Sequence, residues 1–240
     1  MTSWTLSMPS LSQPMPSFVS IELFAIVVGT ACTVGALVPD MSAATATAVL
    51  RSLGETAQRE PTRVRDRVWG ALACIGASAA ALATRGVSLP ALATWLLCLS
   101  LLIAADIDRR HHLLPDAVTL PLLWLGLLVN LGNHVAPLPD AVIGAVGGYL
   151  GLRILSLVVV AITQSDGIGH GDFKLLAAIG AWLGWQALPP VAFIAAALVV
   201  LVGLVRNARS NAAAPSRVAF GPALAVAATV VLFVPSLCHA

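Results

Sequence analysis

The chain has 240 residues, of which 58% are hydrophobic and only 10% are charged. An ordinary soluble domain carries roughly 25% charged residues, so this composition excludes a soluble globular protein. The mean hydropathy of +0.92 leaves no room for a separate soluble domain larger than a loop. We therefore expect an all-α polytopic membrane protein with one membrane domain over residues 18–240. The net charge of +2 is small, and we expect no nucleic-acid partner.

Apolar and polar stretches alternate along the whole chain. Residues 1–17 are rich in Ser and Pro, lack the features of a secretory signal, and are predicted to be a mobile tail. Residues 18–38 are long enough to cross a hydrocarbon core of roughly 30 Å. The polar residues 39–68 are predicted to form a loop that is partly helical along the membrane surface. Further apolar runs cover residues 69–84, 89–107, 113–129, 141–162, 173–185, 191–205 and 218–234. About eight transmembrane helices are therefore predicted.

The basic residues orient these predicted spans. In an eight-span arrangement, the loops after the first, third, fifth and seventh spans share one side of the membrane. That side holds every Lys and Arg of the chain except Arg85 and Arg153. Basic residues are retained in cytoplasmic loops, so this side is predicted to be cytoplasmic. Asp108 and Asp172 then both lie at the cytoplasmic face.

Two polar stretches place carboxylates where apolar runs end. Residues 106–116 read DIDRRHHLLPD, and residues 167–172 read GIGHGD. A carboxylate at a membrane boundary is costly unless it has a partner or a function. We therefore take these two stretches as the halves of one candidate site.

Asp172 precedes a predicted helix, where an Asp is ordinarily a cap that accepts free backbone N–H groups. Gly167, Gly169 and Gly171 alternate before it, and glycines allow close approaches that residues with a Cβ do not. Such a loop could hold an extended peptide beside the carboxylate, whereas a cap needs no glycines. We therefore predict a functional Asp172, a substrate-binding glycine loop, and a Lys174 that positions this loop or offsets charge.

The three acids of the other stretch are not equivalent. Asp106 and Asp108 are two residues apart, so on a helix they point to nearly opposite sides. Only one of them can face Asp172, and spacing alone does not choose between them. Asp116 closes a Pro-Asp pair, and a second such pair at residues 139–140 predicts a helix-start role for it.

The histidines and cysteines do not predict a metal site. His111 and His112 are adjacent on a short loop and project apart, whereas a metal site needs further ligands at compatible spacing. We expect them to be polar surface residues, and His170 in the glycine loop has no assigned role. The four cysteines lie in or beside apolar runs without any CxxC spacing, so neither a disulfide framework nor a zinc site is indicated.

Four segments together resemble one family, the type IV prepilin peptidases, which are membrane aspartic proteases of the GxGD class. The matching segments are IDRRHHLLPD at 107–116, GAVGGYLG at 144–151, GHGDFKLLAAIGAWLGW at 169–185 and FGPALA at 220–225. With the order of the spans, the resemblance covers about residues 70–235. The run that follows the GxGD motif is long and specific to this family.

The resemblance implies a function and a catalytic pair. The family pattern has an Asp eight residues before the Asp of the Pro-Asp pair, which is Asp108 here, and a second catalytic Asp at the end of GxGD, which is Asp172. It implies a bacterial inner-membrane enzyme that removes the basic leader of type IV prepilins or pseudopilins. The cut falls on the cytoplasmic side, after a Gly and just before the hydrophobic helix of the substrate. The small-residue faces of residues 69–84 and 144–151 are candidate surfaces for that helix.

The chain departs from the family pattern in one respect. Long members carry two CxxC pairs in the loop after the first span, and this zinc module is associated with methylation of the new N-terminus from S-adenosylmethionine. Residues 39–68 contain no cysteine. We therefore expect a short form that cuts without zinc or another cofactor.

Two other functions use similar residues. A proton-coupled transporter could relay protons through Asp106, Asp108 and Asp172, and it predicts acids near the bilayer midplane and repeated halves. No internal repeat is evident in the sequence. An intramembrane protease of the presenilin type shares GxGD but does not account for the run that follows it.

Overall fold

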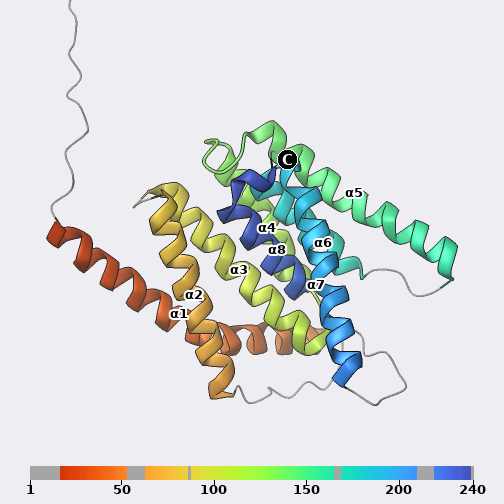
Figure 1. Cartoon of the computed structure of the whole chain (residues 1–240), viewed down its shortest axis with the longest axis horizontal. Coiled ribbons are helices and arrows are strands. Elements are labelled where there is room, and N and C mark those ends of the chain that lie inside the picture. Colours follow the sequence, from red (N-terminus) through yellow and green to blue (C-terminus); the bar gives the residue numbers. More distant parts are fainter. Residues whose placement is uncertain (1–16, 53–62, 86–87, 165–168, 210–218, 239–240) are drawn as a thin grey trace, which may run out of the picture.

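The part of the chain that the structure describes consists of helices joined by short turns and loops, without a β-strand. The structure is a computed structural model, and it describes residues 17–52, 63–85, 88–164, 169–209 and 219–238 (Figure 1). The predicted tail therefore lies outside the described residues except for Ser17. The α-helices are α1 (Ser17–Ser52), α2 (Val64–Arg85), α3 (Leu89–His111), α4 (Asp116–Asn130), α5 (Leu138–Thr163), α6 (His170–Leu183), α7 (Leu188–Arg209) and α8 (Gly221–Phe233). Short 3-10 turns follow α6 and α8, at Trp185–Ala187 and Pro235–Cys238.

The predicted all-α class is confirmed, and membrane character is supported by helix length and hydropathy. Within the described residues, four helical stretches are long and apolar enough to cross a membrane: Ala31–Ser52, Leu89–His111, Leu138–Ile162 and Trp185–Arg209. Helices α4 and α8 are apolar but shorter. The prediction of about eight spans, and that of a cytoplasmic active-site face, therefore remain predictions.

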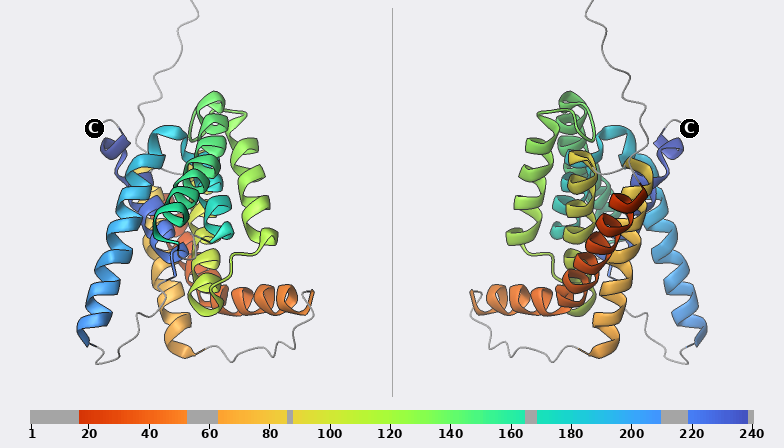
Figure 2. Two further views of the ribbon diagram at one scale, coloured as in Figure 1. Left: turned by 90° about the vertical axis from the view of Figure 1, so that its right-hand side faces the viewer. Right: turned by 90° about the vertical axis from the view of Figure 1, so that its left-hand side faces the viewer.

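Helix α1 continues past the point where a loop was expected. Residues 39–52 are helical and α2 begins at Val64, so the stretch over residues 39–68, expected as a partly helical loop, is helical at both ends. Pro39 lies inside α1, where its ring removes a backbone hydrogen bond and bends a helix. In Figure 2 the first part of α1 rises steeply, while its second part lies across the lower side of the molecule.

The glycines of α5 pack that helix against α6. A Cβ added to Gly144 would collide with the carbonyl oxygen of Gly180, and one added to Gly180 would collide with that of Gly144. A Cβ on Gly148 would lie 2.7 Å from the carbonyl oxygen of Leu176. The predicted close helix approach is thus confirmed for Gly144 and Gly148. Helix α6 occupies this face of α5. The face around residues 144–151, predicted as a candidate surface for the substrate helix, is therefore not free to bind one.

A buried polar side chain fixes the far end of α6. Asn130 has 0% exposure, and its amide donates hydrogen bonds to the carbonyl oxygens of Ala181 at 2.9 Å and Trp182 at 3.0 Å. Its side-chain oxygen accepts from the backbone N–H groups of the turn that follows α4. The buried Trp182 indole donates to the carbonyl oxygen of Leu122 at 2.8 Å. Helix α6 is therefore tied to α4 at its C-terminal end, which gives its N-terminal end a defined position.

Candidate active site

Asp108 lies near the C-terminal end of α3 and is only 6% exposed. One of its carboxylate oxygens, Oδ2, accepts a hydrogen bond from the backbone N–H of Gly221 at 2.8 Å. Gly221 is the first residue of α8, and the first backbone N–H groups of a helix have no partner within the helix. The carboxylate therefore meets the positive end of α8, where negative charge is stabilised.

Gly221 allows this contact because it has no side chain. A Cβ at this position would lie 2.7 Å from Asp108 Oδ2 and 3.0 Å from Asp108 Cβ, closer than atoms pack. Sequence reasoning gave Gly221 no role, although it belongs to the segment FGPALA that carried part of the family resemblance. That segment was the available signal for a residue near the site.

Asp172 lies in the first turn of α6, ahead of the predicted span that begins at residue 173. Its backbone N–H donates to the carbonyl oxygen of Gly169 at 3.1 Å. Burial, and then the negative charge of the neighbouring Asp108, raise the pKa of Asp172 from 3.8 to about 7. The structure thus brings Asp172 within electrostatic reach of Asp108. Helix α8 packs against both α3 and α6, in the middle of Figure 1.

The glycines before Asp172 serve close packing. Gly169 has an ordinary extended backbone, with φ −60° and ψ 138°, and a Cβ there would lie 3.2 Å from Asp172 Oδ2. A Cβ on Gly171 would lie 2.6 Å from the Cβ of Leu114, in the segment between α3 and α4. Gly167 lies outside the described residues. The substrate-binding role of these glycines therefore remains a prediction.

Lys174 connects the first turns of two helices. Its ammonium group forms an ion pair with Asp116, which is the first residue of α4, as the Pro-Asp pattern predicted. This contact holds the beginning of α6 beside the beginning of α4. It fits the predicted role of Lys174 in positioning the loop, whereas a direct contact with substrate remains a prediction.

Asp106 faces the opposite way from Asp108. It accepts hydrogen bonds from Arg109 at 2.7 Å, from Arg110 at 2.9 Å and from the Ser42 hydroxyl of α1. Arg110 also forms an ion pair with Asp66 of α2 at 3.1 Å. Asp106 is thus occupied by a polar cluster that joins α1, α2 and α3, and it is the charge of Asp108 that acts on Asp172.

The histidines do not form a ligand cluster in the part of the chain that the structure describes. No three His, Cys, Asp or Glu side chains among the described residues come together so as to hold a metal ion. His112 ends α3 in a left-handed conformation, with φ 50°, and its N–H donates to the carbonyl oxygen of Asp108. The ring of His170 stacks obliquely against Phe173, with centroids 5.5 Å apart.

Comparison with known proteins finds relatives of one kind. Residues 95–204 match the model of the type IV leader peptidase family. A prepilin leader peptidase/N-methyltransferase of Burkholderia pseudomallei (strain 1026b) is 48% identical over 164 residues, 68% of this chain and 50% of the relative. A protein with the same name from Dickeya chrysanthemi is 48% identical over 55% of this chain and 47% of its own length. Another from Pseudomonas putida is 48% identical over 59% of this chain and 49% of its own length. The chain spans about half the length of these curated relatives. No solved structure matches the chain.

Proposed function

We propose that this chain is a member of the type IV leader peptidase family, whose model matches residues 95–204, and that it is an aspartic endopeptidase of the bacterial inner membrane with several membrane spans. Its substrates are type IV prepilins or pseudopilins, in line with the names of its relatives. It removes the basic leader on the cytoplasmic side of the membrane. The catalytic residues are Asp108 and Asp172.

The observation that carries this proposal is the pairing of two carboxyl groups with unequal environments. Asp108 is buried, and the hydrogen bond from the Gly221 N–H at the N-terminus of α8 offsets part of the cost of its negative charge. Burial and that same negative charge keep a proton on Asp172 up to about pH 7. Peptide hydrolysis by two carboxyl groups needs one ionised and one protonated partner, and this pair provides both near neutral pH.

The proposed reaction needs a water molecule and the two carboxyl groups. Asp108 takes a proton from the water, whose oxygen attacks the carbonyl carbon of the scissile peptide bond. Asp172 donates its proton to the carbonyl oxygen as the tetrahedral intermediate forms. When the intermediate collapses, the C–N bond breaks and the proton held by Asp108 passes to the leaving amine. Asp172 takes back a proton from one hydroxyl of the intermediate as the carbonyl group re-forms, so both carboxyl groups return to their starting states.

Cleavage without methylation is part of the proposal. The relatives are named prepilin leader peptidase/N-methyltransferase. Residues 39–68 have no cysteine and so lack the CxxC pairs of the zinc module. We propose that the chain acts as a peptidase alone.

The positions of the acids favour a peptidase over a proton-coupled transporter. Asp108 lies near the end of α3 and Asp172 in the first turn of α6, so both belong to helix ends. A proton relay across the bilayer requires acids near the midplane. Asp106, the third acid of a possible relay, is held by arginines on the other side of α3.

The direct test is to sequence the N-terminus of the product. We expect purified protein, incubated with a type IV prepilin, to release a product that begins just after the leader. The product should carry an unmodified N-terminus with and without S-adenosylmethionine. A substrate that is not shortened would refute the peptidase proposal, whereas a methylated product would refute cleavage without methylation.

The pH dependence of cleavage follows from the raised pKa of Asp172. We expect the rate to fall as the pH rises above about 7, because Asp172 then loses the proton that it must donate. The rate should also fall at acidic pH, where both carboxyl groups are protonated and neither accepts a proton. Initial rates measured between pH 5 and pH 9, with thermal stability followed in parallel, check this expectation. A rate that continues to rise to pH 9 would contradict it.

A further inference from the structure

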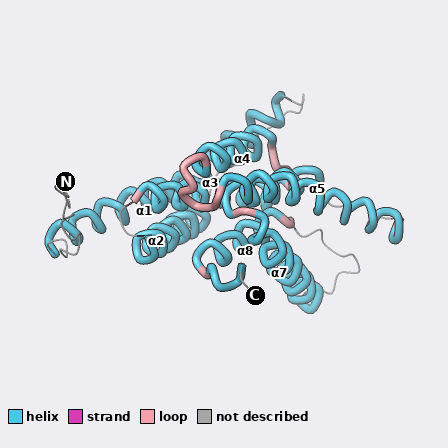
Figure 3. The backbone as a smooth tube through the Cα atoms, turned by 90° about the horizontal axis from the view of Figure 1, so that it is seen from above, coloured by secondary structure: helices cyan, strands magenta, loops and turns pink. Residues whose placement is uncertain are grey.

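A groove runs along α3 between α2 and α8. Both helices pack on α3 but touch each other little, and Figure 3 shows them as separate neighbours of α3. Two hollows of about 450 and 400 Å³ lie in this space. They share Ala73 of α2, Leu102 and Ala105 of α3, and Pro222 of α8. The two hollows therefore form one continuous groove.

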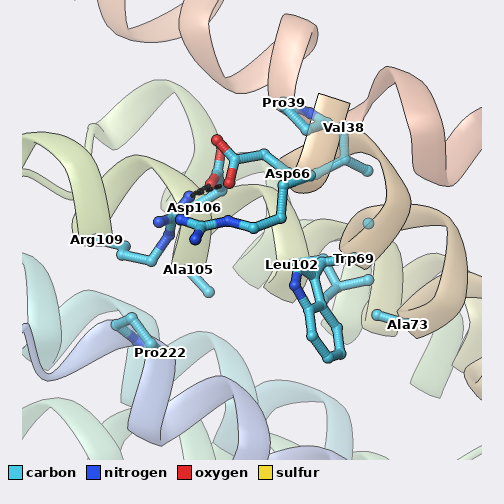
Figure 4. Close-up of a pocket in the computed structure, with 12 residues that line it drawn as sticks. Val38, Pro39, Asp66, Trp69, Ala73, Leu102, Ala105, Asp106, Arg109 and Pro222 are labelled. Carbon is cyan, nitrogen blue, oxygen red and sulfur yellow. Dashed lines mark hydrogen bonds and ion pairs between the residues drawn. The ribbon is translucent and has the colours of Figure 1, made fainter. Parts of the chain in front are cut away.

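The groove changes character along its length. At one end, Asp66, Asp106 and Arg109 line it together with the indole of Trp69 (Figure 4). At the other end its walls are almost entirely apolar, and on α2 they consist of small residues. The small residues of that wall are Ala73, Gly76, Ala77 and Ala80. Small residues allow another helix to approach closely in lipid.

The groove passes beside the catalytic pair. Pro222 lines both hollows, and it directly follows Gly221, whose N–H binds Asp108. The first turn of α8 therefore contributes both to the wall of the groove, through Pro222, and to the surroundings of Asp108, through Gly221.

We propose that this groove receives the apolar helix that follows the scissile bond of the substrate. The inference rests on the proposed peptidase function and adds the surface that holds the substrate. The apolar end of the groove would take the helix, and the ion-paired end would meet the polar segment that leads to the cut. The glycine face of α5 is unsuited to this role, since α6 already covers Gly144 and Gly148.

Gly76 offers a way to fill the groove without disturbing the fold. It lines the apolar half, and a Cβ added there would have no described neighbour within 4 Å. We expect Gly76→Leu to raise KM about tenfold for a prepilin with its apolar helix. The rate on a soluble peptide that spans the cleavage site but stops short of that helix should be unchanged. Val226→Trp, which fills the groove from the α8 wall, should act in the same way.

Gly203→Leu is the matched control. Gly203 lies on α7, away from the groove, and a Cβ there also has no described neighbour within 4 Å. It should leave both substrates unaffected. Unchanged KM for the prepilin in Gly76→Leu and Val226→Trp would mean that lipid or nothing fills the groove, and would overturn the inference. Equal losses on both substrates would overturn it as well. Wild-type protein that cuts neither substrate would instead refute the peptidase proposal itself.

Discussion

Asp108→Asn and Asp172→Asn are each expected to reduce prepilin cleavage by about a thousandfold or more. Asparagine has nearly the shape of aspartate but neither gives up nor accepts a proton at neutral pH. Either change therefore removes one half of the acid–base pair. Leader removal by purified variants, followed by gel shift and by sequencing of the product N-terminus, measures the effect.

Asp140 provides a control for these variants. Its carboxylate accepts hydrogen bonds from Trp185 at 3.2 Å and from Gln186 at 3.1 Å, and none of these three residues lies on a helix that carries the catalytic pair. Asp140→Asn should cleave at close to the wild-type rate. Asp106→Asn is not a control, because Asp106 lines the proposed groove and forms ion pairs with the arginines of α3; we expect it to lower both stability and the rate of cleavage. Full cleavage by Asp108→Asn or Asp172→Asn would rule out the two-aspartate mechanism.

Gly221→Ala is expected to lower kcat about a hundredfold while KM changes little. The added methyl would stand 2.7 Å from Asp108 Oδ2, so the carboxylate must move and its hydrogen bond must lengthen or break. A displacement of about 1 Å at a catalytic group has an effect of this size. Steady-state rates on the prepilin measure both constants.

Two comparisons separate misplacement of Asp108 from general damage by Gly221→Ala. Gly151 of α5 has no described neighbour within 4 Å of an added Cβ, so Gly151→Ala should leave kcat unchanged. In an Asp108→Asn background, Gly221→Ala should cause little further loss, because both changes act on the same carboxylate. Fully additive losses would show that Gly221 acts on something other than Asp108.

The sequence was most informative where its pattern is local. Hydropathy located the apolar helices α2 to α8 to within a few residues, and the Pro-Asp pattern correctly placed the start of α4. It did not locate the end of α1, because the polar character of residues 39–68 predicted a loop from residue 39 whereas the helix continues past Pro39 to Ser52. The alternation of acids at positions 106 and 108 correctly indicated that they face opposite sides.

The partners of the acids could not be predicted, because they come from distant parts of the chain. In the polar cluster around Asp106, Ser42 is 64 residues away from its partner Asp106 in the sequence. Asp66 is 44 residues away from its partner Arg110. Gly221 is 113 residues from Asp108. Such contacts depend on how α1, α2 and α8 pack on α3, which hydropathy does not encode. Asn130, a polar residue just after the apolar run of residues 113–129, is buried through packing of the same kind.

Asp106 and Asp108 connect the last turns of α3 to helices on both of its sides. Through Asp106 and Arg110 this end of α3 is fastened to α1 and α2, and through Asp108 it is fastened to the start of α8. Because close-packed interiors transmit displacement, a helix that pushes α2 away from α8 pulls on this end of α3 from both sides. We therefore expect a helix seated in the proposed groove to change the orientation of the Asp108 carboxylate.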